Sequence, residues 1–243
     1  MTARQRADRL LVERGLFESR ARAQAAIAAG RVSADGVQVR KASEQVSAIA
    51  LIEAAPEHPY VSRGGLKLAA ALDHFHLDAG GRVCLDVGAS TGGFTQVLVW
   101  RGARRVYAVD VGRDQLHPSL RGRSDIVSLE ETDIRGLDPS QLDEPPDLAV
   151  ADVSFISLKL VAPAIGKLLQ PRATLVALIK PQFETQRRDL KKGIVRDPAV
   201  HAAICDDVAA FLASQHWRVG GLMPSPILGG DGNREFFIEA TRG

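Results

Sequence analysis

The chain has few cysteines, no long apolar run and no histidine cluster, the features that form disulfides, membrane spans and metal sites. Its 243 residues include two cysteines, Cys84 and Cys205, and each lies in an apolar pattern, so we expect reduced packing residues in a cytoplasmic protein. No apolar run approaches the roughly 18 residues that span a bilayer, and the arginine-rich start is unlike a secretory signal. The six histidines show no metal-ligand spacing. We therefore expect no disulfide framework, no stable membrane association and no metal site.

The formal net charge of +2 hides an uneven distribution. Residues 1–41 carry nine Arg and Lys against four Asp and Glu, whereas acids outnumber bases in the rest of the chain. An excess of positive charge in one segment attracts polyanions. A solvated basic face is the alternative, and charge alone favours that alternative.

Residues 1–57 have the pattern of a small α+β module. Two helical stretches lie within residues 6–29, where Ser19 is placed to cap the second and Gly30 to end it. Asp35-Gly36 then separates two short alternating runs, which predicts a hairpin. This order of elements resembles the S4 RNA-binding domain, and the resemblance implies that basic side chains contact RNA phosphates. The residues to which we assign that role are Arg6, Arg20, Arg22 and Lys41.

The rest of the chain alternates between strand and helix patterns. Two prolines, Pro56 and Pro59, indicate a short stiff linker over residues 58–65, followed by a domain of residues 66–243. Buried strands are predicted at 83–87, 105–110, 125–129, 147–152, 174–180, 217–223 and 234–240. The segments between them are long enough for crossover helices, most clearly over 156–169 and 198–214. This alternation predicts an α/β fold with a mainly parallel seven-stranded sheet, whose ligands bind at the carboxyl ends of the strands.

A glycine-rich turn follows the first of these strands. The run Val83 to Val87 breaks into a turn that holds Gly88, Gly92 and Gly93, and a helical pattern resumes at Phe94. Glycine lets backbone amides approach a ligand, and the helix presents its positive N-terminal end there. The spacing is not Gly-x-Gly-x-x-Gly, which disfavours a nicotinamide dehydrogenase, the remaining enzyme alternative. A strand-to-helix turn without a ligand is the other interpretation.

Acidic residues recur where the predicted strands end. Asp110 lies 24 residues after Asp86, where a carboxylate can accept hydrogen bonds from ribose hydroxyls, although loop capping would also place acids there. The glycine turn and these acids together make a motif that resembles the one in S-adenosylmethionine-dependent methyltransferases with a Rossmann-like sheet. The resemblance implies S-adenosylmethionine as cofactor. The expected binding residues are Asp86, Gly88, Ala89, Ser90, Gly92, Gly93, Asp110, Asp133, Asp152 and Phe155. For Phe155, packing in the core is an equal alternative.

A second polar set comprises Lys67, Asp152, Lys180 and Glu235. Lys180 ends an apolar strand, where an ammonium is costly unless it is paired, and Asp152 on the neighbouring strand is the expected partner. A structural ion pair explains those two residues but not Lys67 and Glu235. The set resembles that of the FtsJ-type ribose 2′-O-methyltransferases. The resemblance implies that Lys180 removes the hydroxyl proton, that the two acids orient it, and that Lys67 completes the network.

The whole chain, with S4 module, linker and methyltransferase domain in this order, resembles the TlyA-type proteins. The segments that carry the resemblance are 62–67, 86–94, 152–157, 180–184, 192–197 and 232–237. It implies cytidine 2′-O-methylation of ribosomal RNA, with the large subunit favoured because both ends of the chain are compact and the small subunit as a further substrate of some members. Longer members carry Arg-x-Trp-Val in the linker, from which His58-Pro-Tyr-Val61 departs. A linker that responds to the cofactor is therefore not expected here.

Further basic residues flank the expected site. We expect Arg63, Arg187, Arg188, Lys191 and Lys192 to neutralise substrate phosphates. Two alternatives are not enzymes. One is a non-catalytic RNA-binding factor of ribosome assembly, which the intact Lys-Asp-Lys-Glu set disfavours. The other is a membrane-active haemolysin, which the lack of a strongly amphipathic cationic helix disfavours. We expect the protein to act as a monomer on ribosomal RNA or ribosomal subunits.

Overall fold

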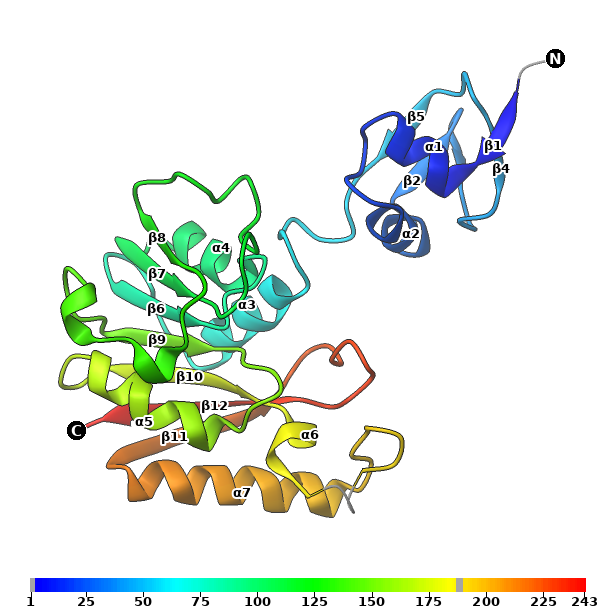
Figure 1. The fold of residues 1–243 in the computed structure, drawn as a ribbon. Helices are drawn as coiled ribbons and strands as arrows, with labels where there is room; N and C mark the ends of the chain where they lie inside the picture. The colour runs from blue at the N-terminus through cyan, green and yellow to red at the C-terminus, as the bar shows by residue number, and fades with distance from the viewer. Residues whose placement is uncertain (1–2, 187–189) are drawn as a thin grey trace. The chain divides into compact units, whose positions relative to one another are not determined.

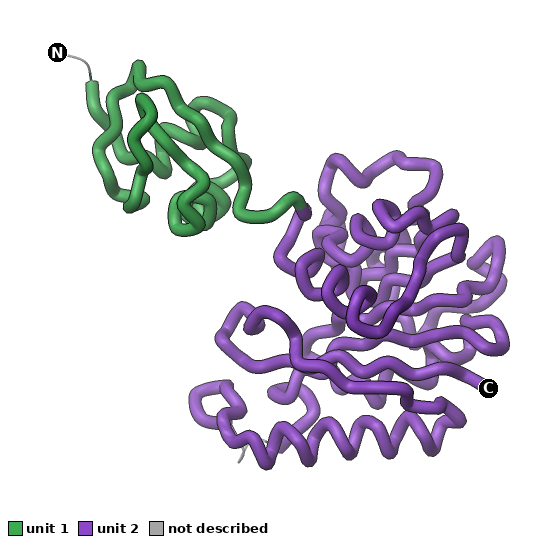
Figure 2. Tube along the Cα trace, turned by 180° about the vertical axis from the view of Figure 1, so that it is seen from behind, with its two compact units in different colours: residues 1–59 green, residues 60–243 purple. Residues whose placement is uncertain are grey.

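The computed structural model describes residues 3–186 and 190–243, and the chain forms two compact units, residues 1–59 and 60–243 (Figure 2). Residues 60–65 of the expected linker lie in the second unit. The ring of Tyr60 lies 5.5 Å from that of Trp100 between centroids, and the backbone N–H of Val61 donates to Gln96 Oε1 at 2.7 Å. The second unit therefore begins directly after Pro59, before the first helix of that unit.

Residues 3–59 of the first unit form two helices and five short strands (Figure 1). They are β1 (Arg4–Arg6), α1 (Ala7–Glu13), α2 (Arg20–Ala28), β2 (Val32–Ala34), β3 (Val37–Gln38), β4 (Gln45–Ser47) and β5 (Ile52–Ala54). β1 pairs with β4, and β2 lies between β3 and β5. The predicted cap is confirmed, since Ser19 accepts the N–H of Arg22. The predicted hairpin is confirmed too, because Asp35 and Gly36 both adopt positive φ between β2 and β3.

The second unit is a seven-stranded sheet with helices on both faces (Figure 1). Its strands are β6 (Val83–Val87), β7 (Arg105–Val109), β8 (Ile126–Leu129), β9 (Leu148–Ala151), β10 (Thr174–Ile179), β11 (Trp217–Pro224) and β12 (Phe236–Arg242). Its helices are α3 (Gly64–His74), α4 (Gly93–Trp100), α5 (Leu158–Leu168), α6 (Pro181–Glu184) and α7 (Pro198–Ser214). The strand order is β11-β12-β10-β9-β6-β7-β8, and β12 runs antiparallel to both of its neighbours. The predicted α/β fold is confirmed.

The alternation of side chains along β6 explains the layers. Val83, Leu85 and Val87 pack with α5 and α7, whereas Cys84 packs on the opposite face with α3 and α4. Strands β6, β7, β9 and β10 are parallel, so their carboxyl ends meet at one edge of the sheet. This edge receives the residues that follow each strand, including the glycine turn.

Two connections differ from the expected crossover helices. β7 and β8 are joined by a loop over residues 110–125, and β8 and β9 by two 3-10 turns, η1 (Ile134–Gly136) and η2 (Pro139–Gln141). The carboxylate of Glu130 accepts the backbone N–H groups of residues 114, 115 and 116 and so holds the loop. The loop packs on the glycine turn, because Leu116 and Leu120 fill the space beside Gly92.

Candidate active site

The glycine turn is shaped by close backbone approaches. Gly88 has φ of +81°, and a β-carbon there would lie 2.6 Å from the carbonyl oxygen of Asp152. Gly92, with φ of +88°, is the N-cap of α4. A β-carbon on Gly93 would collide with Ser62 Oγ. Side chains at Gly88 or Gly93 would therefore push apart the segments that follow β6 and β9 and precede α3.

Asp86 is fully buried beneath this turn. Thr95 Oγ1 donates to its Oδ2 at 2.6 Å, while Oδ1 has no hydrogen-bond partner among the described residues. Burial raises the pKa of Asp86 to about 7, and the negative charge of Asp152 adds to this effect, against the Thr95 hydrogen bond. Asp86 lines neither of the cavities described below. Its effect on a ligand is therefore electrostatic and transmitted through the turn.

A first cavity of about 460 Å³ opens at the ends of β6, β7 and β9. Six of the residues expected to bind a cofactor line it, namely Gly88, Ser90, Asp110, Asp133, Asp152 and Phe155. Its size lies in the range of small-molecule sites. The structure thus brings together acids that are far apart in the sequence.

Asp110 and Asp133 differ in how their carboxylates are held. Asp110 accepts the backbone N–H of Ser90 at 2.8 Å and that of Gly112 at 2.7 Å, so it braces the turn as well as facing the cavity. Each of its oxygens keeps acceptor capacity for a ligand hydroxyl. Asp133 pairs with Arg135 at 2.5 Å, and the hydrogen bonds from Arg135 lower its pKa to about 2. The first cavity is therefore lined by a carboxylate that stays ionised at neutral pH.

Phe155 is not a core residue. It is 91% exposed, has φ of +63°, and its ring lies 5.1 Å from that of Phe183. The alternative of packing in the core is therefore wrong. An exposed ring at the mouth of the first cavity is available to pack against a ligand.

A second cavity of about 500 Å³ adjoins the first. Its lining includes Ser62, Arg63, Lys67, Ala89, Gly93 and Lys180. Four residues line both cavities, namely Gly88, Ser90, Asp152 and Ser154, and we call them the shared wall. Two ligands, one in each cavity, would both contact these four residues.

Lys67 and Glu235 form a buried ion pair beside the second cavity. Lys67 Nζ lies 2.5 Å from Glu235 Oε2, and the two side chains are 10% and 3% exposed. Lys67 comes from α3, whereas Glu235 directly precedes β12. Because breaking such a pair leaves an uncompensated buried charge, it locks α3 to the last strand.

Lys180 forms the second pair of the predicted set. Its Nζ lies 2.6 Å from Asp152 Oδ1 and donates to Ser154 Oγ at 2.7 Å. The lysine follows β10 and its two partners follow β9, which is its parallel neighbour. Lys180 lines the second cavity, and Asp152 lines both. The arrangement places the lysine nitrogen beside residues that line both cavities, which suits removal of a proton from a ligand in the second cavity.

Sequence reasoning missed Ser62, Thr95 and Ser154 as residues of the site. Ser62 and Ser154 lie inside segments that carried the family resemblance, but small hydroxyl side chains give no spacing signal of their own. Thr95 contacts Asp86 across the start of α4, a contact that only the folded turn creates.

Two other segments of the family resemblance have a structural basis. Glu184 accepts a hydrogen bond from Ser157 Oγ and one from the N–H of Leu158, both at 2.6 Å, so it ties the residues after Lys180 to the start of α5. Asn233 is buried, accepts the N–H of Val195 and donates to the carbonyl of Gly193. It therefore ties residues 193–195 to the residues before β12.

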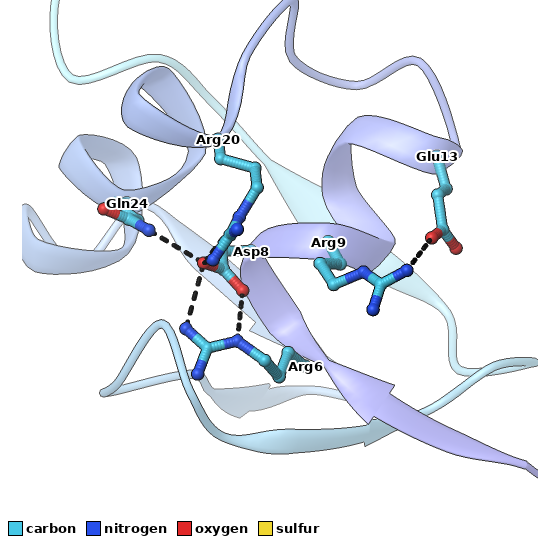
Figure 3. Close-up of polar contacts among 6 residues, drawn as sticks. All are labelled: Arg6, Asp8, Arg9, Glu13, Arg20 and Gln24. Carbon is cyan, nitrogen blue, oxygen red and sulfur yellow. Dashed lines mark hydrogen bonds and ion pairs between the residues drawn. The ribbon is translucent and has the colours of Figure 1, made fainter.

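The N-terminal arginines converge on a buried acid (Figure 3). Asp8 is fully buried and accepts hydrogen bonds from Arg6, Arg20 and Gln24, with distances between 2.7 and 3.2 Å. These bonds hold the pKa of Asp8 well below its usual range. Arg6 and Arg20 keep 40% and 54% of their side-chain surface exposed. They are thus fixed by the fold and still reach solvent.

The remaining predicted RNA contacts lie in several places. Lys41, Lys191 and Lys192 are exposed, and Arg22 is half-buried. Arg63 is exposed, lines the second cavity and donates to the carbonyl of Leu228 at 2.8 Å. Arg187 and Arg188 lie outside the described residues.

Comparison with known proteins identifies the family. The FtsJ-like methyltransferase family matches residues 60–242, and the S4 domain family matches residues 5–48. The chain belongs to the FtsJ-like methyltransferases. This family assignment and the predicted S4 domain are both confirmed, and the two matches fall in the two units of the structure.

Relatives extend the similarity over nearly the full chain. The 16S/23S rRNA (cytidine-2′-O)-methyltransferase TlyA of Mycobacterium tuberculosis is 43% identical over 241 residues, 98% of this chain and 90% of the relative. The 23S rRNA (cytidine-2′-O)-methyltransferase TlyA of Campylobacter jejuni is 38% identical over 73% of this chain and 69% of its own length. A solved structure, a candidate hemolysin from Streptococcus thermophilus, is 41% identical with a TM-score of 0.78, covering 100% of this chain and 90% of the other. The predicted similarity to TlyA-type proteins is therefore confirmed.

Within residues 3–186 and 190–243, no helix has the length and apolar character needed to cross a bilayer. In the same part of the chain, no three His, Cys, Asp or Glu side chains lie in a group that could hold a metal ion.

Proposed function

We propose that this FtsJ-like methyltransferase transfers a methyl group from S-adenosylmethionine to the 2′-hydroxyl of a cytidine in ribosomal RNA, with large-subunit RNA as the main substrate. The observation that carries the proposal is the shared wall, because a donor and an acceptor in the two cavities would meet beside Asp152 and Lys180. The names of the TlyA relatives supply the nucleoside and the RNA class.

The first cavity fits S-adenosylmethionine. Asp110 is placed to accept the ribose hydroxyls, the exposed ring of Phe155 to pack against the ligand, and Gly88 to let it approach the backbone. Asp86 beneath the turn gains a favourable interaction with a cationic ligand, since its ionised form has no cationic partner among the described residues. When bound, S-adenosylmethionine supplies a methyl group on a sulfonium centre.

The second cavity accepts the ribose. Lys180 removes the proton of the 2′-hydroxyl, which is a poor nucleophile until that proton leaves. Asp152 holds Lys180 at 2.6 Å, so the base faces the edge where the cavities meet. Lys67, which also lines the cavity, is held in place by its buried pair with Glu235. Holding both reactants in one geometry supplies much of the rate enhancement.

The first unit serves as the RNA anchor. Arg6 and Arg20, fixed by Asp8, with Arg22 and Lys41, contact phosphates and position the RNA, while Arg63, Lys191 and Lys192 neutralise phosphates near the second cavity. We further propose that the protein acts as a monomer in the cytoplasm, where its substrate is assembled into ribosomes, without a stable membrane association.

Transfer of a radiolabelled methyl group to large subunits, small subunits and naked ribosomal RNA tests this proposal. The label is expected on a cytidine 2′-oxygen, identified by mapping the modified ribose, with large-subunit RNA labelled most. Absence of label on all three substrates, under conditions where the protein is folded and binds S-adenosylmethionine, contradicts the proposal and favours a non-catalytic assembly factor.

Replacement of the base separates chemistry from binding. Lys180→Ala is expected to lower the transfer rate by at least ~100-fold, because general base catalysis contributes that much, while the affinity for S-adenosylmethionine changes less than about threefold. The measurements are labelled-methyl transfer and calorimetric titration of the cofactor. Lys167→Ala, an exposed lysine on α5, is the matched control. Near-normal transfer by Lys180→Ala contradicts the assignment of the base.

A further inference from the structure

Ser154 lies at the junction of the two cavities, and the catalytic set described above does not include it. Ser154 is exposed, and its Oγ accepts a hydrogen bond from Lys180 Nζ at 2.7 Å. It is also one of the four residues of the shared wall. Because Ser154 is exposed, its hydroxyl has water available, so the bond to Lys180 is not needed to satisfy a buried group.

The geometry around Lys180 Nζ indicates how the hydrogen bond to Ser154 could orient the amine. A lysine nitrogen has three tetrahedral positions besides its bond to Cε. Ser154 Oγ at 2.7 Å accepts a hydrogen bond at one of them. Asp152 Oδ1 lies 2.6 Å from Nζ in an ion pair, but no hydrogen bond joins these two atoms. The neutral amine, which is the form that accepts a proton, has two N–H groups and one lone pair. When one N–H donates to Ser154 and the negative charge of Asp152 attracts the other, the lone pair takes the third position.

We propose that Ser154 is a positioning residue that keeps the lone pair of neutral Lys180 directed at the acceptor hydroxyl. With the charge of Asp152 as the only other partner, the second N–H and the lone pair compete for two positions. The N–H would often win the position facing the substrate, because it can donate to the hydroxyl oxygen. Ser154 removes that competition by accepting the second N–H. The inference rests on the proposed methyl transfer and adds a residue to it.

The methyl transfer moves one proton to Lys180 and one methyl group to the ribose oxygen. The proton of the 2′-hydroxyl passes to the lone pair of Lys180 Nζ, which becomes an ammonium with a third N–H. The oxygen forms a bond to the methyl carbon while the carbon–sulfur bond breaks, and its electron pair stays on sulfur as the thioether. The ammonium then returns its proton to solvent through the second cavity. Ser154 gives up no proton at any stage.

Three variants test the proposal in the full-length protein. Ser154→Ala removes the acceptor, Ser154→Thr restores a hydroxyl at the same place, and Ser128→Ala removes an exposed serine on β8 that lines neither cavity. The kcat of labelled-methyl transfer and the KM values for S-adenosylmethionine and RNA are measured from pH 7 to 9.5, after cofactor binding has shown each variant to be folded.

The expected result is a fall in kcat of about tenfold for Ser154→Ala, the size of one missing hydrogen bond, with both KM values within twofold. The loss persists at high pH, since orientation rather than protonation is affected. Ser154→Thr regains most of the rate, and Ser128→Ala behaves as the wild type. A wild-type kcat for Ser154→Ala, a loss confined to KM, full recovery at pH 9.5, or equal losses for Ala and Thr would each overturn the proposal.

Activity of the wild-type protein, measured first, distinguishes failure of the proposed function from failure of the role of Ser154. If the wild-type protein transfers no methyl group, the proposed function fails and this inference fails with it. If the wild type is active and Ser154→Ala is equally active, the inference alone fails.

Discussion

At the scale of single residues, Asp86 shows how a carboxylate can be kept where its charge is costly. It is fully buried, has one hydrogen bond from Thr95, and faces the negative charge of Asp152 at the neighbouring strand end. Its pKa of about 7 means that the folded protein holds a proton there which the unfolded chain releases near pH 4. Folding stability from this residue is therefore greatest below about pH 4 and falls as the pH rises to about 7.

Asp86→Asn tests this linkage. The amide resembles the protonated acid, so the variant is expected to be more stable than the wild type at pH 8.5, by up to ~4 kcal/mol, with a difference that shrinks as the pH falls toward 4.5. Urea unfolding followed by tryptophan fluorescence measures it, because both tryptophans, Trp100 and Trp217, lie in the second unit.

Other groups titrate in the same range, so the informative quantity is the difference between the two proteins at each pH. A difference that stays constant from pH 4.5 to 8.5 would show that Asp86 is already ionised in the folded state. Thr95→Val, which removes the hydrogen bond but not the carboxyl group, is expected to enlarge the pH-dependent difference relative to Asp86→Asn.

At the scale of elements, a single buried acid, Asp8, joins helices α1 and α2. Asp8 on α1 receives Arg20 and Gln24 from α2 and Arg6 from β1, so three segments meet at one carboxylate (Figure 3). Nearby, Arg9 and Glu13 form an exposed pair on α1 at 3.6 Å. The two pairs have similar chemistry but opposite burial, which makes them a matched comparison.

Asp8→Asn is expected to destabilise the first unit by ~3 kcal/mol at pH 7, because it leaves two arginines without their buried counter-charge. Hydrogen exchange of the peptides from residues 3–59 measures this, since neither tryptophan lies in that unit. Asp8 has a depressed pKa, so its contribution is present above about pH 4 and is lost as the pH falls below that. Glu13→Gln, the control, is expected to change stability by less than ~0.5 kcal/mol. Equal protection in both variants would contradict the role of Asp8.

The elements themselves were largely predictable, and the exceptions have physical reasons. Strand β6 and the hairpin at Asp35-Gly36 follow from local pattern and turn chemistry, and both are confirmed. The loop over residues 110–125 was not predictable, because it is held by Glu130 and by packing on Gly92 rather than by its own pattern. Likewise, no local signal shows that Asp8 binds Arg20, since that pairing needs both helices in place.

At the scale of the whole molecule, RNA binding and methyl transfer are assigned to different units. Arg22→Ala with Lys41→Ala in the first unit is expected to weaken RNA affinity and to reduce the slope of log affinity against log salt by about 2, one for each phosphate that is no longer neutralised. The kcat at saturating RNA stays within about twofold, because the second unit is unchanged. Titration of labelled RNA at several salt concentrations measures both quantities. Lys167→Ala serves as the control, and an unchanged slope in the double variant would contradict the role of the first unit.

The order of the two units and the class of the second were predictable because their motifs are local in sequence. The shared wall was not predictable, since it joins residues after β6 with residues after β9 through the approach of Gly88 to the carbonyl of Asp152. Motifs identified the reaction class from charged residues, whereas the exposed Ser154 gained its meaning only from its distance to Lys180.

The shared wall has a consequence for inhibitor design. Because Gly88, Ser90, Asp152 and Ser154 face both cavities, a single compound that joins an adenosine to a cytidine through a short bridge could occupy both at once. Such a compound would gain the effective concentration that linkage provides. A substitution in the wall that gives resistance to such a compound is constrained, since a side chain that excludes the bridge would also lie between the methyl donor and its acceptor.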